Sequence, residues 1–334
     1  MKSFRQVTAI LPSALKEQLE RVPEEIQKQT QEIRLYANRP ICLQSGGILC
    51  FLGADGTICA KPGNYCPILE KNLLEAVLPA VCEYGVHSHQ EEIRRGFVTL
   101  PGGHRAGLSG TGVFHSGELT SLRQISGISI RLARQIKGAA DEILPRWNAQ
   151  SNLLLAGPPG CGKTTVLRDV SRQLGNGSCG TVRKITLIDE RGEIAACCDG
   201  VPQNDVGFCT DVLSLIPKKI AIEMAVRTLA PQLILCDELG GEEEIRAVRY
   251  AMTAGVRFAF SVHGESFRDL LCRPGFSRLF AEELIDHTVF LTNDPIGSVD
   301  RWMGKEEIKN EMDRYRLDPD LRYPAGKGFF CTDE

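Results

Sequence analysis

The stretch LLLAGPPGCGKTT, residues 153–165, constrains this chain more than any other. Three consecutive leucines predict a short buried strand, and the glycines after it allow a turn that most side chains would block. Gly157 and the run Gly162–Thr164 have the spacing of the phosphate-binding pattern G-x-x-x-x-G-K-[ST]. Backbone N–H groups of such a loop surround a phosphate, and the helix that follows adds the positive end of its dipole. We therefore predict a site for a nucleoside triphosphate.

Within this loop, the Lys163 ammonium can reach the outer phosphates and the Thr164 hydroxyl can bind Mg²⁺. Val166, Leu167 and Val170 continue as the apolar stripe of the expected helix, which favours this interpretation over a glycine-rich structural turn. The predicted nucleotide-binding residues are Gly157, Pro158, Pro159, Gly160, Cys161, Gly162, Lys163, Thr164 and Thr165.

Composition limits the classes of protein to which the chain can belong. Its 334 residues, 43% of them hydrophobic and 24% charged, leave room for about two globular domains. A net charge of −3 gives no electrostatic footprint for nucleic acid. The 13 cysteines include no CxxC pair, so no zinc site is expected, and the lack of a signal peptide favours a reducing cytoplasm. No apolar run reaches about 18 residues, so we expect no membrane-spanning helix.

The first part of the chain mixes helices and strands, which predicts a smaller α+β domain over residues 1–137, with a helical start and then a mixed sheet. Pro79 should kink or split the helix expected around residues 69–81. The patterns predict helices within 1–31, strands at 32–36, 41–43, 48–52 and 127–134, and a tight hairpin over 97–108.

From residue 152 the pattern becomes strand, helix, strand, which predicts an α/β fold with a mostly parallel sheet in a second domain, residues 138–334. The tail after about residue 303 is charged and poorly patterned, so we expect it to be loosely held. The predicted strands are 152–156, 184–188, 232–236, 256–262 and 287–291, and the predicted helices are 163–174, 218–229 and 242–254.

Two carboxylates follow the apolar strand that ends at Cys236. An acidic residue at the carboxyl end of such a strand can hold Mg²⁺, and a second can orient or deprotonate an attacking water. We assign Asp237 to the metal and Glu238 to the water. The alternative is that both residues merely cap the next helix.

Two further strands end in polar groups. Asp189 and Glu190 follow one strand and would lie at the edge of the sheet where such folds bind ligands. His263 follows another and could sense the γ-phosphate, although a histidine there is as compatible with an ordinary hydrogen-bonded surface group.

The order of these motifs (phosphate loop, acidic box, second acidic strand, histidine box) resembles that of the secretion and pilus traffic ATPases. The chain is more similar still to the stage III sporulation protein AA family of endospore-forming bacteria. GPPGCGKTT, IDERGEIAA, LILCDELGGEEE and SVHGES resemble motifs of that family. EIRLYANRP, GFVTLPGGHRAGLSG and ISIRLARQIKG are also similar, so the resemblance covers roughly residues 30–295.

The resemblance implies a RecA-like P-loop ATPase domain that hydrolyses ATP with Mg²⁺ as its metal. It implies a homo-oligomeric ring, expected to be a hexamer, in the mother-cell cytoplasm. The ring would be peripherally associated with membrane-embedded components of a sporulation channel to the forespore, which it would power or gate. Carried over residue by residue, the resemblance makes Glu238 the catalytic base. It places Asp189 and Glu190 in the acidic box, Asp189 as a metal ligand and Glu190 as a catalytic group. It places His263 in the histidine box.

Ring ATPases of this kind take arginines from the amino-terminal domain or the linker to the phosphates. Arg131 and Arg134 fit that place best, and Arg105 and Arg191 are further candidates. An arginine that reaches the phosphates only when the domains close would stabilise the negative charge of the transition state for phosphoryl transfer. The alternative is that these arginines pair with surface acids.

Two other functions stay open. An ATP-dependent nucleic-acid motor is disfavoured by the acidic net charge and by the lack of an aromatic and basic tract. A nucleotide-gated assembly platform is disfavoured by Asp237 and Glu238, since pure binding needs no water-orienting carboxylate.

Overall fold

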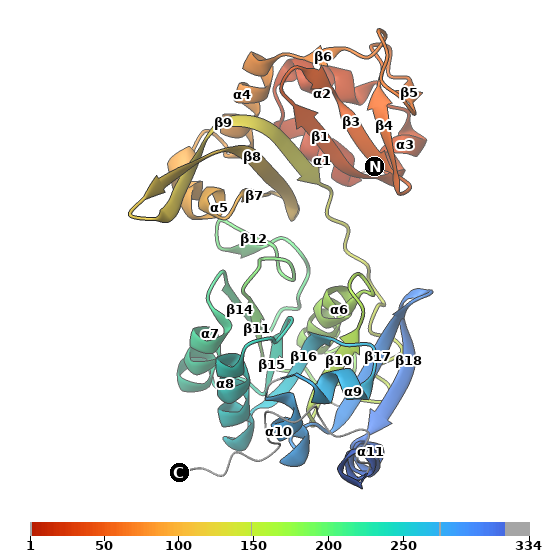
Figure 1. The fold of residues 1–334 in the computed structure, drawn as a ribbon, viewed down its shortest axis with the longest axis vertical. Coiled ribbons are helices and arrows are strands. Elements are labelled where there is room, and N and C mark those ends of the chain that lie inside the picture. Colours follow the sequence, from red (N-terminus) through yellow and green to blue (C-terminus); the bar gives the residue numbers. More distant parts are fainter. Residues whose placement is uncertain (1, 148, 274, 318–334) are drawn as a thin grey trace. The chain divides into compact units, whose positions relative to one another are not determined.

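The structure is a computed structural model that describes residues 2–147, 149–273 and 275–317. The chain divides into two compact units (Figure 1). The first runs to Arg134 and also contains Ala196–Asn204, and the second contains Gln135–Ala195 and continues from Asp205. The domain boundary between residues 137 and 138 stays a prediction, and no sequence pattern indicates that residues 196–204 join the first unit.

Strands of the first unit form an antiparallel sheet in the order β5-β4-β3-β1-β9-β8-β7. The expected mixed sheet is wrong, because short turns join most neighbouring strands and a short turn reverses the chain direction. The elements are α1 (Lys2–Ile10), α2 (Ser13–Glu20), α3 (Glu24–Gln29), β1 (Thr30–Tyr36), β2 (Arg39–Pro40), β3 (Cys42–Ser45), β4 (Ile48–Leu52), β5 (Ile58–Cys59), β6 (Ile68–Leu69), α4 (Lys71–Val81), the 3-10 turn η1 (Val86–His89), α5 (Gln90–Arg94), β7 (Phe97–Leu100), β8 (His104–His115), β9 (Glu118–Arg131), β12 (Cys197–Cys198) and β13 (Val201–Pro202).

Apolar residues from α1, α2 and α4 share one core with alternate residues of this sheet, such as Ile33 and Leu35 of β1. Pro79 lies inside α4, which continues to Val81, so the helix is not split there. Pro79 lies in the last turn of α4, so only Ala80 and Val81 of the helix follow it. The predicted hairpin forms from β7 and β8.

The second unit contains a sheet in the order β14-β11-β15-β16-β10-β17-β18, in which only the β17–β18 pair is antiparallel. All five predicted strands form in it. The elements are β10 (Leu153–Gly157), α6 (Lys163–Gly175), β11 (Ile185–Asp189), β14 (Thr210–Ser214), α7 (Lys218–Met224), the π-helical turn η2 (Ala225–Leu229), β15 (Leu233–Cys236), α8 (Glu242–Thr253), β16 (Arg257–His263), α9 (Phe267–Leu271), α10 (Phe276–Ala281), β17 (His287–Asn293), β18 (Ile296–Gly304) and α11 (Lys305–Leu317).

Side chains alternate between the two faces of this sheet, as they do along any strand. Leu154 and Ala156 of β10 pack in a core with residues of α7 to α11. Helix α6 packs against β10, β11, β15 and β16. The predicted helices α6 and α8 form as expected, and the third is divided into α7 and η2.

The strand order decides where the motif residues meet. Strand β16 lies between β10 and β15 and runs parallel to both, so their carboxyl ends lie at one edge of the sheet. Gly157 pairs with His263 in register, and Cys236, which precedes the two predicted carboxylates, pairs with Phe260. The phosphate loop, both carboxylates and the histidine therefore reach the same edge.

The expectation of a loosely held tail is wrong for residues 305–317, which form α11. Ile308 and Met312 of this helix are buried in the core of the second unit. The few apolar positions of this helix are dispersed among charged ones, and this helical pattern was too weak to be recognised. The remainder of the predicted tail, residues 318–334, lies outside the described residues. Within the described ranges, no helix combines the length and apolarity needed to cross a membrane.

Candidate nucleotide site

The loop between β10 and α6 has a positive φ at three glycines, Gly157, Gly160 and Gly162, a backbone region that favours glycine. Gly157 has φ of +153°, and a Cβ atom there would lie 2.6 Å from both Cys161 Sγ and the Leu291 carbonyl oxygen. Gly162 has φ of +91° and immediately precedes α6, which begins at Lys163. The loop is therefore a tight turn that leads directly into a helix N-terminus, the arrangement that favours a bound phosphate.

Lys163 is almost fully buried, and its ammonium lies over the loop backbone. Nζ donates to the carbonyl oxygens of Gly157 and Pro158, at 2.8 Å each, and lies 3.2 Å from Nδ1 of His263. The Lys163 ammonium is therefore held next to the loop backbone, where it can neutralise an anionic ligand.

The two residues predicted to bind the metal, Thr164 and Asp237, are in direct contact with each other. The Thr164 hydroxyl donates to Asp237 Oδ2 at 3.0 Å, and the Ser261 hydroxyl donates to Oδ1 at 2.7 Å. One hydroxyl and one carboxylate beside a phosphate loop fit Mg²⁺, which takes few protein oxygens and completes its shell with water and substrate phosphates. No cluster of three or more His, Cys, Asp or Glu side chains suited to a metal occurs among the described residues.

Ser261 is a site residue that the sequence analysis missed. It is fully buried on β16, where it also accepts a hydrogen bond from the Glu238 amide at 3.0 Å. A buried hydroxyl needs such partners. The serine inside the apolar run FAFSV was the signal that could have identified it.

Glu238 is held from two sides. Oε2 accepts from Arg191 Nη1 at 2.7 Å, and Oε1 lies 2.8 Å from His263 Nε2. Its backbone has φ of +22°, a region that non-glycine residues rarely occupy and that is concentrated at functional sites. The Glu238 amide also donates to Asp237 Oδ1 at 2.9 Å, so the backbone and the carboxylate are both fixed in place.

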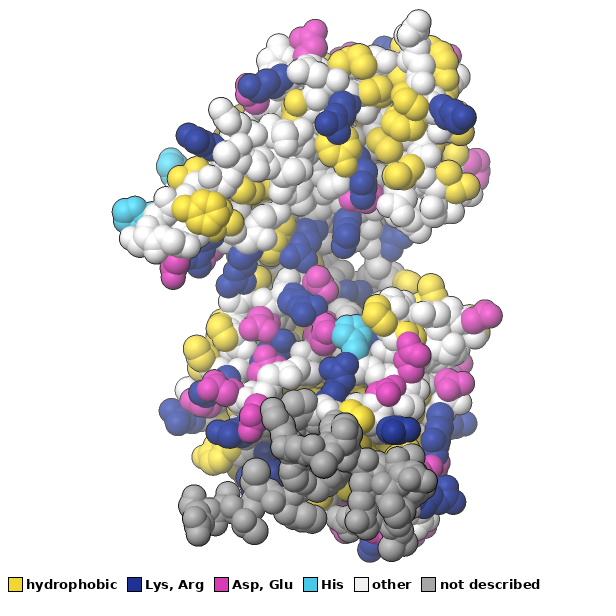
Figure 2. All heavy atoms as spheres, in the orientation of Figure 1, with side chains coloured by type: hydrophobic (Ala, Val, Ile, Leu, Met, Phe, Trp, Pro, Cys, Tyr) yellow, Lys and Arg dark blue, Asp and Glu magenta, His cyan; other side chains and the backbone are white. Residues whose placement is uncertain are grey.

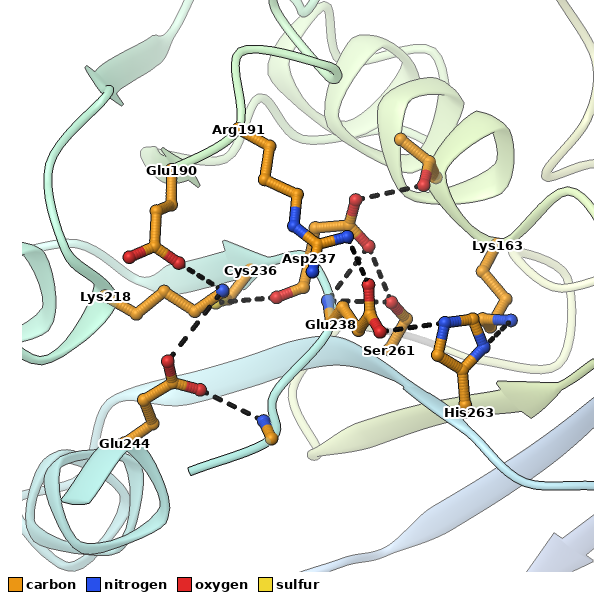
Figure 3. Close-up of polar contacts among 12 residues, drawn as sticks. Lys163, Glu190, Arg191, Lys218, Cys236, Asp237, Glu238, Glu244, Ser261 and His263 are labelled. Atoms are coloured by element: carbon orange, nitrogen blue, oxygen red, sulfur yellow. Dashed lines mark hydrogen bonds and ion pairs between the residues drawn. The ribbon is translucent and has the colours of Figure 1, made fainter. Parts of the chain in front are cut away.

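His263 lies between the loop lysine and the predicted base (Figure 3). Because Nδ1 faces a donor and Nε2 faces a carboxylate, the network favours the neutral tautomer with its proton on Nε2. One continuous chain of polar contacts runs from Lys163 through His263 and Glu238 to Arg191. Of the two interpretations left open for this histidine, the geometry favours the one that links it to the nucleotide site.

Asp189 does not have the environment expected of a metal ligand. It is fully buried, and its two oxygens accept the backbone N–H groups of Glu193, Ile194 and Ala195 at 2.8 to 3.1 Å. Burial raises the pKa of its carboxyl, although these three hydrogen bonds oppose the shift. The carboxylate therefore shapes the loop 189–195, and the metal role assigned to it does not fit this geometry.

Glu190 is also turned away from the phosphate loop. It pairs with Lys218 at 2.5 Å, on the side of Lys218 rather than of Lys163 in Figure 3. Lys218 is 5% exposed and was missed, because one lysine before a helical pattern has no distinguishing signal. Burial lowers its pKa, but the hydrogen bond to Glu190 and the nearby carboxylates outweigh this and raise it. Glu190 thus belongs to a structural ion pair, which does not fit a catalytic role.

The predicted arginines fall in both units. Arg191 contacts Glu238, as described. Arg131 is exposed at the end of β9, and Arg134 donates to the Thr30 carbonyl oxygen at 2.7 Å within the first unit. The Arg105 guanidinium lies over the Phe97 ring, 3.6 Å from its centre. Contacts of Arg131, Arg134 or Arg105 with phosphate stay predictions.

Two cavities lie at opposite ends of the second sheet. One of about 360 Å³ adjoins Gly157 and Pro158 and is also lined by Phe290–Asn293, Glu265 and Asp300. A larger one of about 720 Å³ lies near the amino ends of β10, β11 and β17. The smaller cavity lies at the carboxyl ends of the parallel strands, the edge at which such sheets bind ligands.

The family model described as "Sporulation stage III, protein AA" matches residues 1–305. The chain belongs to that family. Stage III sporulation protein AA of Bacillus subtilis is 35% identical over 292 residues, which cover 86% of this chain and 91% of that protein. The uncharacterized protein ycf45 of Porphyra purpurea is 31% identical over 186 residues, 53% of this chain and 31% of that protein.

Among solved structures, the Legionella pneumophila ATPase DotB has a TM-score of 0.56 and 17% identity, covering 84% of this chain and 76% of that one. The pilus retraction motor PilT with bound ADP has a TM-score of 0.54 and 14% identity, covering 88% of this chain and 86% of that one. At these identities the likeness concerns the fold alone, and it agrees with the predicted RecA-like fold of the second unit.

Proposed function

We propose that the chain is a Mg²⁺-dependent ATPase that forms a homo-oligomeric ring and powers or gates a secretion-like channel between mother cell and forespore. The observation that carries the ATPase proposal is the convergence of Thr164, Asp237 and Glu238 beside the phosphate loop. A fold that only bound nucleotide would need the loop but not a carboxylate fixed in a strained backbone beside it.

In this proposal the loop N–H groups and Lys163 bind the phosphates of ATP. Thr164 and Asp237 would hold Mg²⁺, which supplies positive charge to the phosphate oxygens. Glu238 orients a water towards the γ-phosphorus and accepts its proton as the new P–O bond forms and the bond to ADP breaks. His263 fixes the direction of the Glu238 carboxylate through the contact at Nε2.

The ring, its place in the mother-cell cytoplasm and its membrane partners are proposed from the family and from the fold. The sporulation family fits a role in endospore formation, and the solved structures with a similar fold include an ATPase and a pilus retraction motor. Arg131 and Arg134 remain the candidates to contact phosphate, including that of a neighbouring subunit. A shared site of this kind would make hydrolysis depend on assembly.

The proposal is tested by ATP turnover of the full chain with Mg²⁺, measured across a range of protein concentrations and compared with Arg131→Ala. A rate per subunit that rises with concentration and falls in the variant is expected for a ring with shared sites. A constant rate that is indifferent to Arg131 would contradict the ring. Absence of ATP binding at every concentration would contradict the ATPase itself.

The nucleic-acid alternative is less well supported. Figure 2 shows acidic and basic side chains interspersed over the visible face of the second unit, without one continuous basic patch there. Strand-tracking grooves of nucleic-acid motors are predominantly basic. Salt-dependent binding to single-stranded oligonucleotides would revive this alternative.

A further inference from the structure

The loop that carries Arg191 connects Glu238 to the first unit. Arg191 lies 47 residues before Glu238 in the chain, yet its guanidinium donates to the carboxylate at 2.7 Å. The Glu238 backbone is fixed by Asp237 and Ser261, so the position of the side chain depends on Arg191 and His263.

The backbone of the loop that carries Arg191 is closed around Asp189. Three successive N–H groups, from Glu193 to Ala195, donate to the Asp189 carboxylate. Arg168 of α6 donates to the carbonyl oxygens of Glu193 and Ile194 at 2.6 and 2.7 Å. A loop held by five hydrogen bonds over three residues moves as one piece.

The chain continues from Ala195 directly into Ala196–Asn204, which belongs to the first unit and contains the β12–β13 hairpin. There Gln203 accepts a hydrogen bond from the Gly102 amide at 2.8 Å, and the Cys198 thiol donates to the Thr99 carbonyl oxygen at 3.7 Å. A Cβ atom at Gly103 would lie 3.2 Å from that of Ala196, so the hairpin packs closely on this turn.

We propose that Arg191 is a positioning residue for Glu238, and that the hairpin 196–204 is a strap through which the first unit sets that position. This inference rests on the proposed ATPase activity. No residue separates the closed loop from the strap, because Ala195 ends one and Ala196 begins the other. Displacement of the hairpin would therefore move the loop, and with it the guanidinium that holds the base.

The first test compares steady-state ATP hydrolysis by the full-length wild type, Arg191→Ala and Arg191→Lys. Arg246→Ala is the matched control, since it removes another exposed arginine–glutamate pair of the second unit. We expect kcat of Arg191→Ala to fall about 10- to 100-fold with KM for ATP unchanged, the size of effect that misplacement of a catalytic group produces. Arg191→Lys should restore part of kcat, because its ammonium can still reach the carboxylate.

The second test adds length to the strap. Gly-Ser-Gly-Ser inserted between Ala195 and Ala196 should lower kcat as Arg191→Ala does, and the two changes together should be no worse than either alone. The control is the same insertion between Asp199 and Gly200, at the hairpin turn, which leaves the connection to Ala195 unchanged. Circular dichroism and thermal unfolding of both insertion variants check that each is folded.

Four outcomes would overturn the inference. Wild-type kcat in Arg191→Ala excludes the positioning role, and a raised KM with unchanged kcat would mean that Arg191 contacts the nucleotide instead. Equal kcat for the two folded insertion variants would exclude the strap. A wild-type protein that neither binds nor hydrolyses ATP would refute the proposed function as well, which distinguishes that failure from the others.

Discussion

Thr164 donates a hydrogen bond of 3.0 Å to Asp237, although 73 residues separate them in the chain. The contact joins the first turn of α6 to the end of β15, and it exists because β16 places the ends of β10 and β15 at one edge of the sheet. A hydroxyl and a carboxylate at this distance can share one Mg²⁺ ion beside a bound phosphate.

Thr164→Ala should raise the Mg²⁺ concentration needed for half-maximal ATP hydrolysis by about tenfold, because one of two protein oxygens for the metal is lost. Thr164→Ser keeps the hydroxyl and should behave like the wild type. The measurement is a Mg²⁺ titration of turnover at saturating ATP. An unchanged Mg²⁺ requirement in Thr164→Ala would show that this contact is not part of a metal site.

Glu190→Gln should leave kcat within about threefold of the wild type, since the carboxylate pairs with Lys218 and does not face the phosphate loop. It should lower the free energy of unfolding by about 1–3 kcal/mol, because the almost buried Lys218 loses its closest anion. Turnover and chemical denaturation measure the two effects. A loss of activity as large as that of a missing general base would restore Glu190 to the catalytic set.

The sequence predicts the residues of the phosphate loop and of the Asp237–Glu238 pair because each requirement is local: glycines for a positive φ, and acids directly after an apolar strand. Asp189 and Glu190 have the same local pattern but different roles. Asp189 accepts hydrogen bonds from the loop that follows it, and Glu190 pairs with Lys218, which is distant in the chain. Lys218 could not be assigned for the same reason, because its carboxylate partner Glu190 is distant in the chain. The hairpin 196–204 has no apolar periodicity, so its place in the first unit could not be predicted.

Gly157→Ala should abolish measurable ATP binding and destabilise the protein by about 1–3 kcal/mol, since the new methyl group would meet the Leu291 carbonyl and the Cys161 sulfur. Gly240→Ala is the control, because its Cβ would have no neighbour within 4 Å and its φ is not positive. Calorimetric titration with ATP and thermal unfolding provide the comparison. Normal ATP affinity in Gly157→Ala would mean that the loop tolerates a side chain there.

His104 should make stability depend on pH. Burial lowers the pKa of this histidine from 6.5 to about 4, and its Nδ1 accepts the Ala133 N–H at 2.9 Å. Below pH 6.5 the unfolded chain gains a proton that the folded protein takes up only near pH 4. The stabilisation is therefore complete above pH 6.5 and is lost as the pH falls towards 4, by at most about 1.4 kcal/mol per pH unit.

The check is His104→Asn, whose amide oxygen can accept the same N–H but does not titrate. The stability difference between wild type and variant should shrink as the pH falls from 6.5 to 4. His115→Asn, at the exposed end of β8, should follow the wild type throughout. Parallel stability curves for the wild type and His104→Asn would rule out this effect.

The most direct test of the central claim is Glu238→Gln in the full chain, measured for both ATP binding and hydrolysis. Glu243→Gln, an exposed acid-to-amide change on α8, is the control and should retain wild-type turnover. We predict that Glu238→Gln binds Mg²⁺-ATP with near-normal affinity but hydrolyses it about 10²- to 10⁴-fold more slowly, the usual contribution of a general base. Turnover in Glu238→Gln equal to that of the wild type would contradict the account.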